Sequence, residues 1–323
     1  MFESLVEQLR EVLPDLGVNL AVDGKAIHSA GKASDKARDG RRDTDADWGA
    51  KSYRGQRADG SLWSKVSHWF GYKLHLLIDA DHELPLGYKV TRASVNDTTE
   101  LLPLMAELEK RHPEIVEQAQ TLSGDKGYDS QANTQGLYDT YQILPLIDIR
   151  HDWKDGENTR PLDPRRVDVI VYDQDGTLFC AADKQMMPLA YDGFEKQRGT
   201  LKYRCPAAVY GLDCPEREHC GAGTYGRVIR VPLSLDRRRF IPVPRSSYKF
   251  KRLYKKRTAV ERVNSRLDVS FGFERHFIRG QQKMKVRIGI ALTVMLAMAL
   301  GRIRQGHSKQ MRSLIEPVWP RAA

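Results

Sequence analysis

Three acidic residues occupy settings that are unusual for surface carboxylates. Asp23 lies within the apolar segment AVDGKAI, Asp125 follows a short apolar run in LSGDKGYDS, and Glu261 lies in a basic segment with helical periodicity. A carboxylate inside an apolar strand costs free energy unless it has a partner. Each residue also has a purely structural explanation, since Asp before Gly is common in turns and a Glu among arginines often forms a solvated ion pair.

Taken together, the three carboxylates suit a divalent metal centre. Mg²⁺ prefers oxygen ligands in near-octahedral geometry. Two such ions about 4 Å apart can activate the attacking oxygen and stabilise the leaving oxygen in phosphodiester cleavage. Two aspartates at strand ends and a glutamate on a helix that crosses them could build this site. The pattern therefore predicts two Mg²⁺ ions, for which Mn²⁺ is expected to substitute.

The predicted secondary structure places these residues on one sheet and one helix. Residues 69–79 repeat apolar side chains with the period of a strand, and residues 98–111 with the period of a helix that Asn96 to Thr98 can cap. Strands are predicted at 18–27, 69–79, 83–91 and 142–149, with a short one ending at Gly124–Asp125, and helices at 98–111 and 130–139. This order predicts an α/β fold with a mixed sheet.

Two other stretches differ from this core. Residues 28–66 are polar and predict a long loop, and residues 152–248 contain short alternating pieces that predict a β-rich insertion. Helical periodicity returns at 250–269 and 284–303. The most apolar segment, residues 288–301, is shorter than the roughly 20 residues of a membrane span, so we expect a buried helix and no membrane partner.

The composition favours a soluble protein with a polyanionic partner. The 323 residues include 52 Lys and Arg against 42 Asp and Glu, a formal charge of +10, which suits nucleic acid. The first residues carry acids in an amphipathic pattern and do not resemble a secretion signal. The four cysteines are therefore expected to stay reduced inside the cell.

Six sequence blocks together resemble the DDE transposases of bacterial insertion sequences. They are AVDGKAI (21–27), WFGYKLHLLID (69–79), ASVNDTTEL (93–101), GDKGYDS (124–130), PLIDIR (145–150) and RTAVERVNSRLDVSFGFERHFIRG (257–280). The resemblance implies a ribonuclease-H-like mixed five-stranded sheet flanked by helices, with a β-rich insertion before the Glu-bearing helix. It also implies that Asp23, Asp125 and Glu261 are the catalytic metal ligands.

The same resemblance suggests a division of the chain. The expected segments are a short N-terminal helix (1–17), the first part of the core (18–150), the insertion (151–249), the C-terminal helices of the core (250–305) and a polar tail (306–323). Family members commonly carry a helical DNA-binding region before the first catalytic strand, where this sequence has only residues 1–17. A truncated copy, a fragment or a competing product is therefore an alternative to a full transposase.

The family shows a Tyr-Arg-Glu-Lys pattern around its Glu. Tyr254, Arg257 and Glu261 match this pattern, and with Asn264 they repeat at three or four residues, so they share one helix face. Asp268 occupies the Lys position. The family's last DNA contact would then have to come from another residue.

Basic residues before this helix are expected to bind DNA. From Arg245 to Arg257, seven Lys or Arg side chains alternate with aromatic ones, a composition that suits phosphate contacts without sequence readout. The alternative is a solvated helix face with its aromatic rings in the core. Arg262 or Arg266 could replace the missing Lys. The residues expected at the DNA are Tyr254, Arg257, Lys249, Lys251, Arg252, Lys255, Lys256 and Asn264.

Other polar groups have competing interpretations. Cys205, Cys214 and Cys220, with Cys180 or His219, could hold a structural Zn²⁺, but their spacing lacks the paired knuckles of a zinc ribbon, and ordinary thiols are the alternative. The loop at 28–66 carries basic residues together with an Asp-Ala-Asp-Trp-Gly stretch at 45–49. It is expected either to fold over DNA or to be a disordered connection.

The resemblance implies a DNA transposase that cleaves at transposon ends and joins the freed 3′-hydroxyl to target DNA. Its expected partners are double-stranded DNA and further copies of the chain, as a homodimer or higher oligomer in a synaptic complex. Its expected location is the cytoplasm, at the nucleoid. The alternatives are a metal-dependent nuclease or resolvase of the same fold, which would not join strands, and a non-catalytic DNA-binding remnant.

Overall fold

The computed structural model describes residues 1–31, 43–165, 169–181, 186–214, 216, 220 and 226–314. The chain divides into two units: the first unit comprises Met1–Tyr128 and Lys256–Ala323, and the second comprises Asp129–Lys255. The second unit begins earlier than the expected insertion at residue 151. The reason is that residues 129–150 pack with later ones, as when the ring of Tyr138 contacts that of Phe194 edge-on at 6.0 Å.

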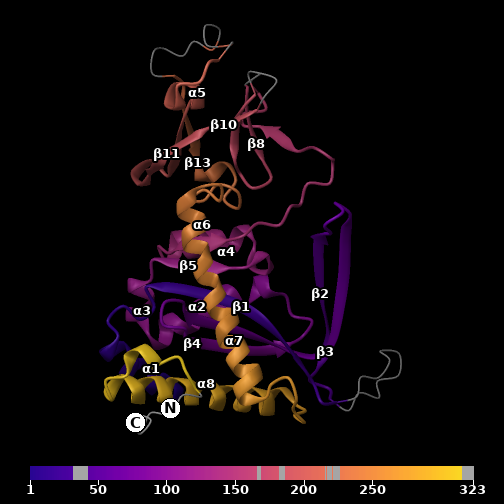
Figure 1. Ribbon diagram of the computed structural model, residues 1–323, viewed down its shortest axis with the longest axis vertical. Helices are drawn as coiled ribbons and strands as arrows, with labels where there is room; N and C mark the ends of the chain where they lie inside the picture. Colours follow the sequence, from indigo (N-terminus) through magenta and orange to yellow (C-terminus); the bar gives the residue numbers. More distant parts are fainter. Residues whose placement is uncertain are drawn as a thin grey trace. The chain divides into compact units, whose positions relative to one another are not determined.

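A mixed sheet forms the centre of the first unit (Figure 1). The sheet has six strands rather than the five expected, and those within this unit are β1 (Asn19–His28), β2 (Asp47–Gln56), β3 (Leu62–Asp79), β4 (Leu84–Arg92) and β5 (Thr121–Gly124). Strand β3 pairs antiparallel with β1, β2 and β4, whereas β1 pairs in parallel with β5. The predicted mixed sheet is confirmed, with both kinds of pairing meeting at β1.

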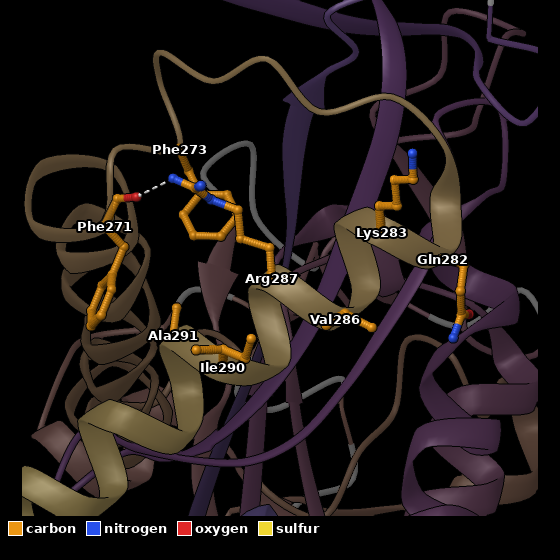
Figure 2. Close-up of a pocket in the computed structure, with 8 residues that line it drawn as sticks. All are labelled: Phe271, Phe273, Gln282, Lys283, Val286, Arg287, Ile290 and Ala291. Atoms are coloured by element: carbon orange, nitrogen blue, oxygen red, sulfur yellow. Dashed lines mark hydrogen bonds between the residues drawn. The ribbon is translucent and has the colours of Figure 1, made fainter.

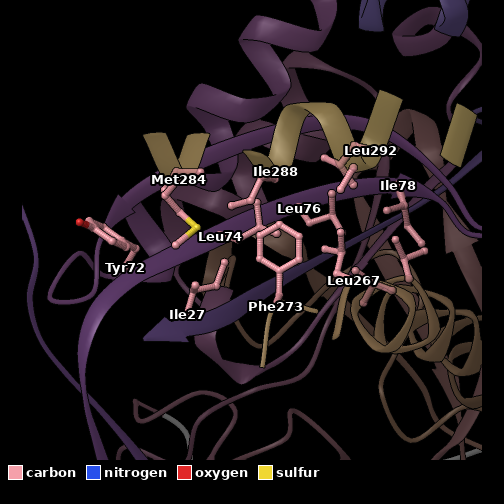
Figure 3. Packing of buried hydrophobic residues seen from close by; sticks show 14 of the residues in the cluster. Ile27, Tyr72, Leu74, Leu76, Ile78, Leu267, Phe273, Met284, Ile288 and Leu292 are labelled. Carbon is pink, nitrogen blue, oxygen red and sulfur yellow. The ribbon is translucent and has the colours of Figure 1, made fainter. Parts of the chain in front are cut away.

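Helices cover this sheet. They are α1 (Phe2–Val12), α2 (Leu101–Arg111), α3 (Pro113–Gln118), α7 (Thr258–Phe271) and α8 (Gln281–Arg304), with short 3₁₀ turns η2 (Asp97–Thr99), η3 (Lys126–Tyr128), η7 (Lys255–Arg257) and η8 (Ser308–Gln310). Alternate residues of β3, among them Leu74 and Leu76, point into one core with Leu267 of α7 and Ile288 of α8 (Figure 3). The period of two in the strand therefore selects the face that α7 and α8 cover.

The apolar helix α8 is a core helix. By length and mean hydropathy (1.8) it could cross a membrane, but 44% of its most apolar window is buried inside the first unit. Met284, Ile288 and Leu292 are fully buried there, and α8 also packs against α1 and β4. One helix of this kind is weak evidence for a span, because core helices satisfy the same criteria.

The Asp-rich stretch at 43–47 has a structural role at the start of α8. Asp43 accepts a hydrogen bond from the backbone N–H of Gly280, and Asp45 accepts one from Gln281 at 3.1 Å. The first N–H groups of a helix have no partner within the helix, and negative charge there is favourable. These two aspartates therefore cap α8 from a segment that is more than 230 residues away in the sequence.

The predicted loop at 28–66 is wrong for residues 47–66. Strand β2 and the first half of β3 form a two-stranded ribbon there (Figure 1). Both faces of the ribbon are exposed, so its side chains do not alternate between apolar and polar. Strand prediction relies on that alternation, which is why the pattern indicated a loop. The basic residues at 32–42 lie outside the described residues.

The second unit holds two small antiparallel sheets, with strand order β10-β9-β8-β7 and β11-β12-β13, so the region predicted to be β-rich does contain strands. Its core includes Leu178, Leu201 and Phe240. Its strands are β6 (Leu144–Ile147), β7 (Thr159–Pro161), β8 (Ile170–Asp173), β9 (Leu178–Cys180), β10 (Met187–Pro188), β11 (Ala190–Glu195), β12 (Thr200–Arg204) and β13 (Val228–Pro232). Its helices are α4 (Gln131–Gln135), α5 (Pro206–Tyr210) and α6 (Tyr248–Tyr254), with the π-helix η4 (Gly136–Thr140) and the 3₁₀ turns η5 (Lys196–Arg198) and η6 (Leu233–Leu235).

Candidate active site

Two of the three predicted carboxylates lie on neighbouring strands. Strands β1 and β5 run in parallel with Val22 opposite Gly124, so the residues that follow, Asp23 and Asp125, come next to each other. The Oδ1 atom of Asp125 accepts a hydrogen bond from the backbone N–H of Gly127 at 2.7 Å. Parallel pairing thus brings together two acids that are 102 positions apart in the sequence.

The carboxylate of Asp23 is buried and lies close to a second negative charge. Burial raises its pKa, and the neighbouring charge of Asp125 raises it further. The positive charges of Lys51 and Arg257 offset part of this effect. Two adjacent carboxylates repel each other, and the repulsion is relieved by protonation or by a cation between them.

Helix α7 is held over β1 by two polar contacts. The Nδ2 atom of Asn264 donates to Asp23 Oδ2 at 3.0 Å, and Lys25 Nζ forms an ion pair with Asp268 Oδ2 at 2.5 Å. Asp23 and Lys25 are two residues apart on the strand, and Asn264 and Asp268 are four apart on the helix, so each pair shares one face of its element. The two contacts therefore form side by side between the same two faces. They fix both the position of α7 along the strand and the orientation of the Asp23 carboxylate.

These contacts change two expectations about α7. Asn264, expected at the DNA, is 9% exposed and binds Asp23, because the helix face that carries it packs on β1. Arg262 and Arg266, considered as replacements for the family's Lys, both bind the buried carboxylate of Glu83. The cation at Asp268 is Lys25, which β1 supplies.

Glu261 lies on the same helix, one turn before Asn264. Its Oε1 is 2.7 Å from Arg257 Nη2, and its side chain is 53% exposed. Within the described parts of the chain, no three His, Cys, Asp or Glu side chains are close enough together to hold one metal ion. The structure thus brings Asp23 and Asp125 together and leaves Glu261 with Arg257. Arg257 attracts that carboxylate, and without a cation the two aspartates would repel a third negative charge.

A fourth carboxylate, Asp97, lies against the backbone of both aspartate segments. A β-carbon added to Gly24 would come within 2.7 Å of Asp97 Oδ1, and one added to Gly127 within 3.0 Å of Asp97 Oδ2. The two oxygens of Asp97 therefore rest on the glycines that follow Asp23 and Asp125. Such close contact is possible only because neither glycine has a side chain.

Lys73 of β3 forms an ion pair with Asp97, and His75 of the same strand lies beside it. Lys73 Nζ lies 3.1 Å from Asp97 Oδ1 and also donates to the carbonyl of Val95. The fully buried ring of His75 lies 3.5 Å from the same oxygen. Burial lowers the pKa of His75 to about 4, so this ring is neutral near pH 7 and Lys73 supplies the positive charge.

Sequence reasoning missed Asp97 because the residues around it explain it locally. The predicted cap exists, since the Asn96 side chain accepts a hydrogen bond from the N–H of Thr98. The signal that could have revealed a further role is Gly24, which directly follows Asp23 within β1. A glycine within a strand often marks close approach of another group.

In the basic segment before α7, residues 245–257, some side chains are exposed and others contact protein groups. Lys249, Lys251, Arg252 and Lys255 are exposed. Lys256 Nζ pairs with Asp81 Oδ1 at 2.5 Å. The Tyr254 ring stacks on Phe250 with centroids 5.4 Å apart, and both belong to an apolar cluster of the second unit. The expected alternation of basic and aromatic residues thus separates into a cationic surface and an aromatic pair that packs inward.

The four cysteines form no disulfide among the described residues, and each is partly buried. None of them belongs to a metal-binding group in the part of the chain that the structure describes, and His219 lies outside that part. The expected Zn²⁺ therefore has no cluster of described ligands that supports it.

A hollow of about 540 Å³ lies along α8, apart from the aspartates (Figure 2). Its lining is mostly apolar, with Arg287 donating to the carbonyl of Phe271 at 3.0 Å. None of its lining residues is acidic, and neither Asp23 nor Asp125 is among them. The hollow lacks the groups that hydrolysis of a phosphodiester requires.

Comparison with known proteins settles the family. Residues 18–297 match the sequence profile described as the transposase DDE domain, a span that contains Asp23, Asp125 and Glu261. The chain belongs to this DDE transposase family. No curated protein matches it. Among solved structures, a piggyBac transposase synaptic complex with hairpin DNA is similar, with 12% sequence identity and a TM-score of 0.40, over 96% of this chain and 57% of that chain.

The span that matches the DDE transposase family covers most of both units. The matched span includes β1, β5 and α7, which are the elements that carry the three predicted acids and Asn264. It also includes the whole second unit. That unit is therefore part of the matched transposase domain.

Proposed function

We propose that this chain is a DNA transposase domain that cleaves DNA at transposon ends and transfers the freed strand into target DNA. The observation that carries the proposal is the placement of Asp23 beside Asp125, beneath a helix that bears Glu261, in a member of the DDE family. The strand order β4-β3-β1-β5, antiparallel up to β1 and parallel after it, supports a ribonuclease-H-like core.

The donor set suits a hard divalent cation. Asp23 and Asp125 present adjacent oxygen ligands whose mutual repulsion a cation relieves, and Mg²⁺ favours carboxylates and retains several waters. Asp23, Asp125 and Glu261 would hold the Mg²⁺ or Mn²⁺ ions. Bound there, two such ions supply a Lewis acid for the phosphate and lower the pKa of the attacking water or hydroxyl.

The side chains of the DDE domain then have distinct roles. Asn264 orients Asp23 through its hydrogen bond, and Asp97 fixes the backbone behind both aspartates. Glu261 is half exposed, so packing does not prevent its side chain from turning away from Arg257 toward the aspartates. Arg257 could then bind a DNA phosphate, for which its planar guanidinium is well suited.

The proposed partner is double-stranded DNA, both the transposon end and the target. The net charge of +10 and the exposed residues Lys249, Lys251, Arg252 and Lys255 support backbone contacts. Joining two ends to one target requires more than one active site, so we infer a homodimer or higher oligomer in the synaptic complex. The place of action is the nucleoid in the cytoplasm.

A nicking and joining assay with Mg²⁺ or Mn²⁺ tests this function. The substrate is duplex DNA from the two sides of the coding sequence, and the wild-type chain is compared with Asp125→Asn. Asn keeps an oxygen acceptor for the N–H of Gly127, so the fold is retained while the charge is lost. We expect nicked and joined products from the wild type and at least a ~1000-fold loss in the variant, the order of loss found when a central catalytic group is removed.

Each outcome of this assay separates the candidate functions. Equal activity in both proteins would refute the assignment of Asp125. Nicked products that never join would identify a nuclease of the same fold. DNA binding without cleavage in either metal would identify a non-catalytic DNA-binding derivative.

A further inference from the structure

The ribbon formed by β2 and the first half of β3 has two unlike faces. In register, Gly49 faces Trp69, Lys51 faces Ser67, Tyr53 faces Lys65 and Gly55 faces Trp63. Paired residues in an antiparallel ladder point to the same side, and every second residue shares that side. One face, termed the arm face, therefore carries Lys51, Tyr53, Trp63 and Lys65, with Trp69 at its base.

Two tryptophan–glycine pairs fix the register of the arm. A β-carbon at Gly49 would lie 2.4 Å from the ring of Trp69, and one at Gly55 would lie 2.6 Å from Nε1 of Trp63. Each indole thus lies directly over the glycine opposite it, where a side chain would collide. The turn from Arg57 to Ser61 closes with backbone hydrogen bonds of 2.8 and 3.0 Å. The ribbon is therefore a shaped arm with a defined register.

The arm face is cationic. Lys51 and Lys65 are exposed, and neither forms an ion pair with any residue that the structure describes. By contrast, Lys25, Lys73 and Lys256 are each paired with an aspartate. The acids of the ribbon are Asp47, at its base, and Asp59, which caps the turn through the N–H of Ser61. Between the base and the turn, the arm face offers positive charge and aromatic edges with no carboxylate.

The arm also extends from the sheet that carries Asp23. Strand β3 pairs with β1 through residues 71–79 and with β2 through residues 62–71, so the arm continues the strand that lies beside β1. A duplex held at Asp23 and Asp125 can therefore extend along the arm. A two-stranded ribbon has dimensions that DNA grooves admit.

We propose that the arm face binds the phosphate backbone of the DNA duplex that is held at Asp23 and Asp125. This inference rests on the proposed transposase function. It assigns the phosphate contacts to Lys51 and Lys65. Tyr53, which is opposite Lys65, and Trp63 lie on the same face. Lysine–phosphate contacts add affinity regardless of sequence and release counterions, so they make binding depend on salt.

The test is the binding of a fluorescently labelled DNA duplex of arbitrary sequence, followed by anisotropy in EDTA over a series of salt concentrations. The arm variant is Lys51→Gln/Lys65→Gln. The matched control, Lys110→Gln/Lys309→Gln, removes the same charge from exposed positions on α2 and η8. We expect about tenfold weaker binding for the arm variant and a salt slope that is smaller by about 1.8, because each phosphate contact contributes about 0.9. The charge-preserving variant Lys51→Arg/Lys65→Arg should bind like the wild type.

Two further comparisons test whether the ribbon binds DNA through its other face or contacts a second copy of the chain. Leu62→Gln/Val66→Thr alters the opposite face, where both side chains are more than half exposed. If this variant loses dimerisation or DNA binding while the arm variant keeps both, the ribbon contacts a second copy or uses its other face, and the proposal is overturned. An arm variant with wild-type affinity and slope would overturn it as well.

The fate of this proposal can be told apart from that of the proposed function. Binding is measured without metal, so its result does not depend on cleavage. If the arm variant loses DNA binding but neither it nor the wild type cleaves DNA, the proposed role of the arm is supported and the proposed transposase activity is refuted. If the wild type nicks and joins DNA and the arm variant does so equally well, the proposed role of the arm is refuted and the proposed transposase activity is supported.

Discussion

At the level of single residues, the candidate site depends on two glycines, whose lack of a side chain leaves room for a nearby carboxylate. Gly24 and Gly127 allow the two oxygens of Asp97 to rest on the backbone that carries Asp23 and Asp125. Lys73 holds Asp97 from the other side. A carboxylate clamped in this way limits the movement of both segments, which is how residues behind metal ligands commonly act.

We predict that Gly24→Ala reduces DNA cleavage by about 10- to 100-fold, the usual cost of disturbing groups behind a metal site. The added methyl group would lie 2.7 Å from Asp97 Oδ1, so Asp97 or the backbone at Asp23 must move. The matched control is Gly87→Ala on β4, where the new methyl group would meet only Leu77, at 4.0 Å. Initial nicking rates in Mg²⁺ measure both variants, and equal rates would show that the contact with Asp97 has no catalytic importance.

The sequence predicted Asp23 and Asp125 as metal ligands partly because a carboxylate in an apolar strand or directly after one is costly. The resemblance to DDE transposases, whose acids fall on these two positions, decided the prediction. Asp97 was not conspicuous, because a cap with Asn96 accounts for its position fully at the local level. Its contacts with Lys73 and Gly24 come from other strands. Only tertiary structure shows that a cap residue also supports the site.

At the level of elements, α7 and β1 are aligned by the ion pair of Lys25 with Asp268 and by the hydrogen bond of Asn264 with Asp23. The family's Lys is replaced by Asp on the helix, and a Lys on the strand compensates for the change in charge. The helix was predictable from its periodicity, whereas its partner strand was not, because the two residues of the pair are 243 positions apart.

We predict that Lys25→Met destabilises the protein by about 2 kcal/mol and that Lys25→Met/Asp268→Leu recovers most of this loss. The single variant leaves Asp268 without its cation at a site where the side chains are only 14% and 21% exposed. Breaking such a pair costs more than replacing both partners with apolar groups. Urea unfolding measures each variant, and a double variant as unstable as the single one would contradict the prediction.

The ribbon shows where reasoning from periodicity stops at the element scale. Residues 62–68 of β3 are exposed on both faces, so they lack the alternation that predicted the rest of the strand from Trp69 onward. What holds these residues extended is their pairing with β2, together with Trp63 over Gly55. Such cross-strand pairs can be recognised only once the register is known.

At the level of the whole molecule, distant segments of the first unit are joined by charged groups that sequence reasoning did not pair. Glu83 is 5% exposed and binds Arg262, Arg266 and Arg312, which come from α7 and from the segment after η8. Apart from the ribbon of β2 and β3, most strands and helices of this unit could be predicted from local patterns. The network that closes the chain on itself could not, because each of its members resembles an ordinary surface charge when it is considered alone.

The N-terminal helix is tied down in the same way and gives stability a dependence on pH. His112, which is 1% exposed, lies between Glu3 and Glu7 of α1, with its Nε2 2.7 Å from Glu3 Oε2. Burial alone would lower the pKa of His112, but the two glutamates outweigh this and raise it above its ordinary value of 6.5. The same hydrogen bonds lower the pKa of both glutamates below 4.5, against the effect of burial.

The direction of each shift sets the pH window of the stabilisation. A raised pKa on His112 stabilises the folded chain fully below about pH 6.5 and ceases to do so as the pH rises through the raised value. The lowered pKa values of Glu3 and Glu7 stabilise it above about pH 4.5 and cease to do so as the pH falls through them. The network therefore contributes most between about pH 4.5 and pH 6.5.

We predict that His112→Gln lowers the urea midpoint of unfolding at about pH 6 more than at about pH 9, where the imidazole of the wild type has lost its proton. Gln keeps a donor for one glutamate but removes the titration, the second contact and part of the packing; only the loss of titration depends on pH. His82, whose pKa is raised by its hydrogen bond to Asp79, remains in the variant and serves as an internal reference for pH effects that are not due to His112. An equal loss at both pH values would mean that His112 contributes by packing alone. A greater loss at high pH would mean that the pKa of His112 is lowered in the folded chain, and that α1 is held by the neutral ring.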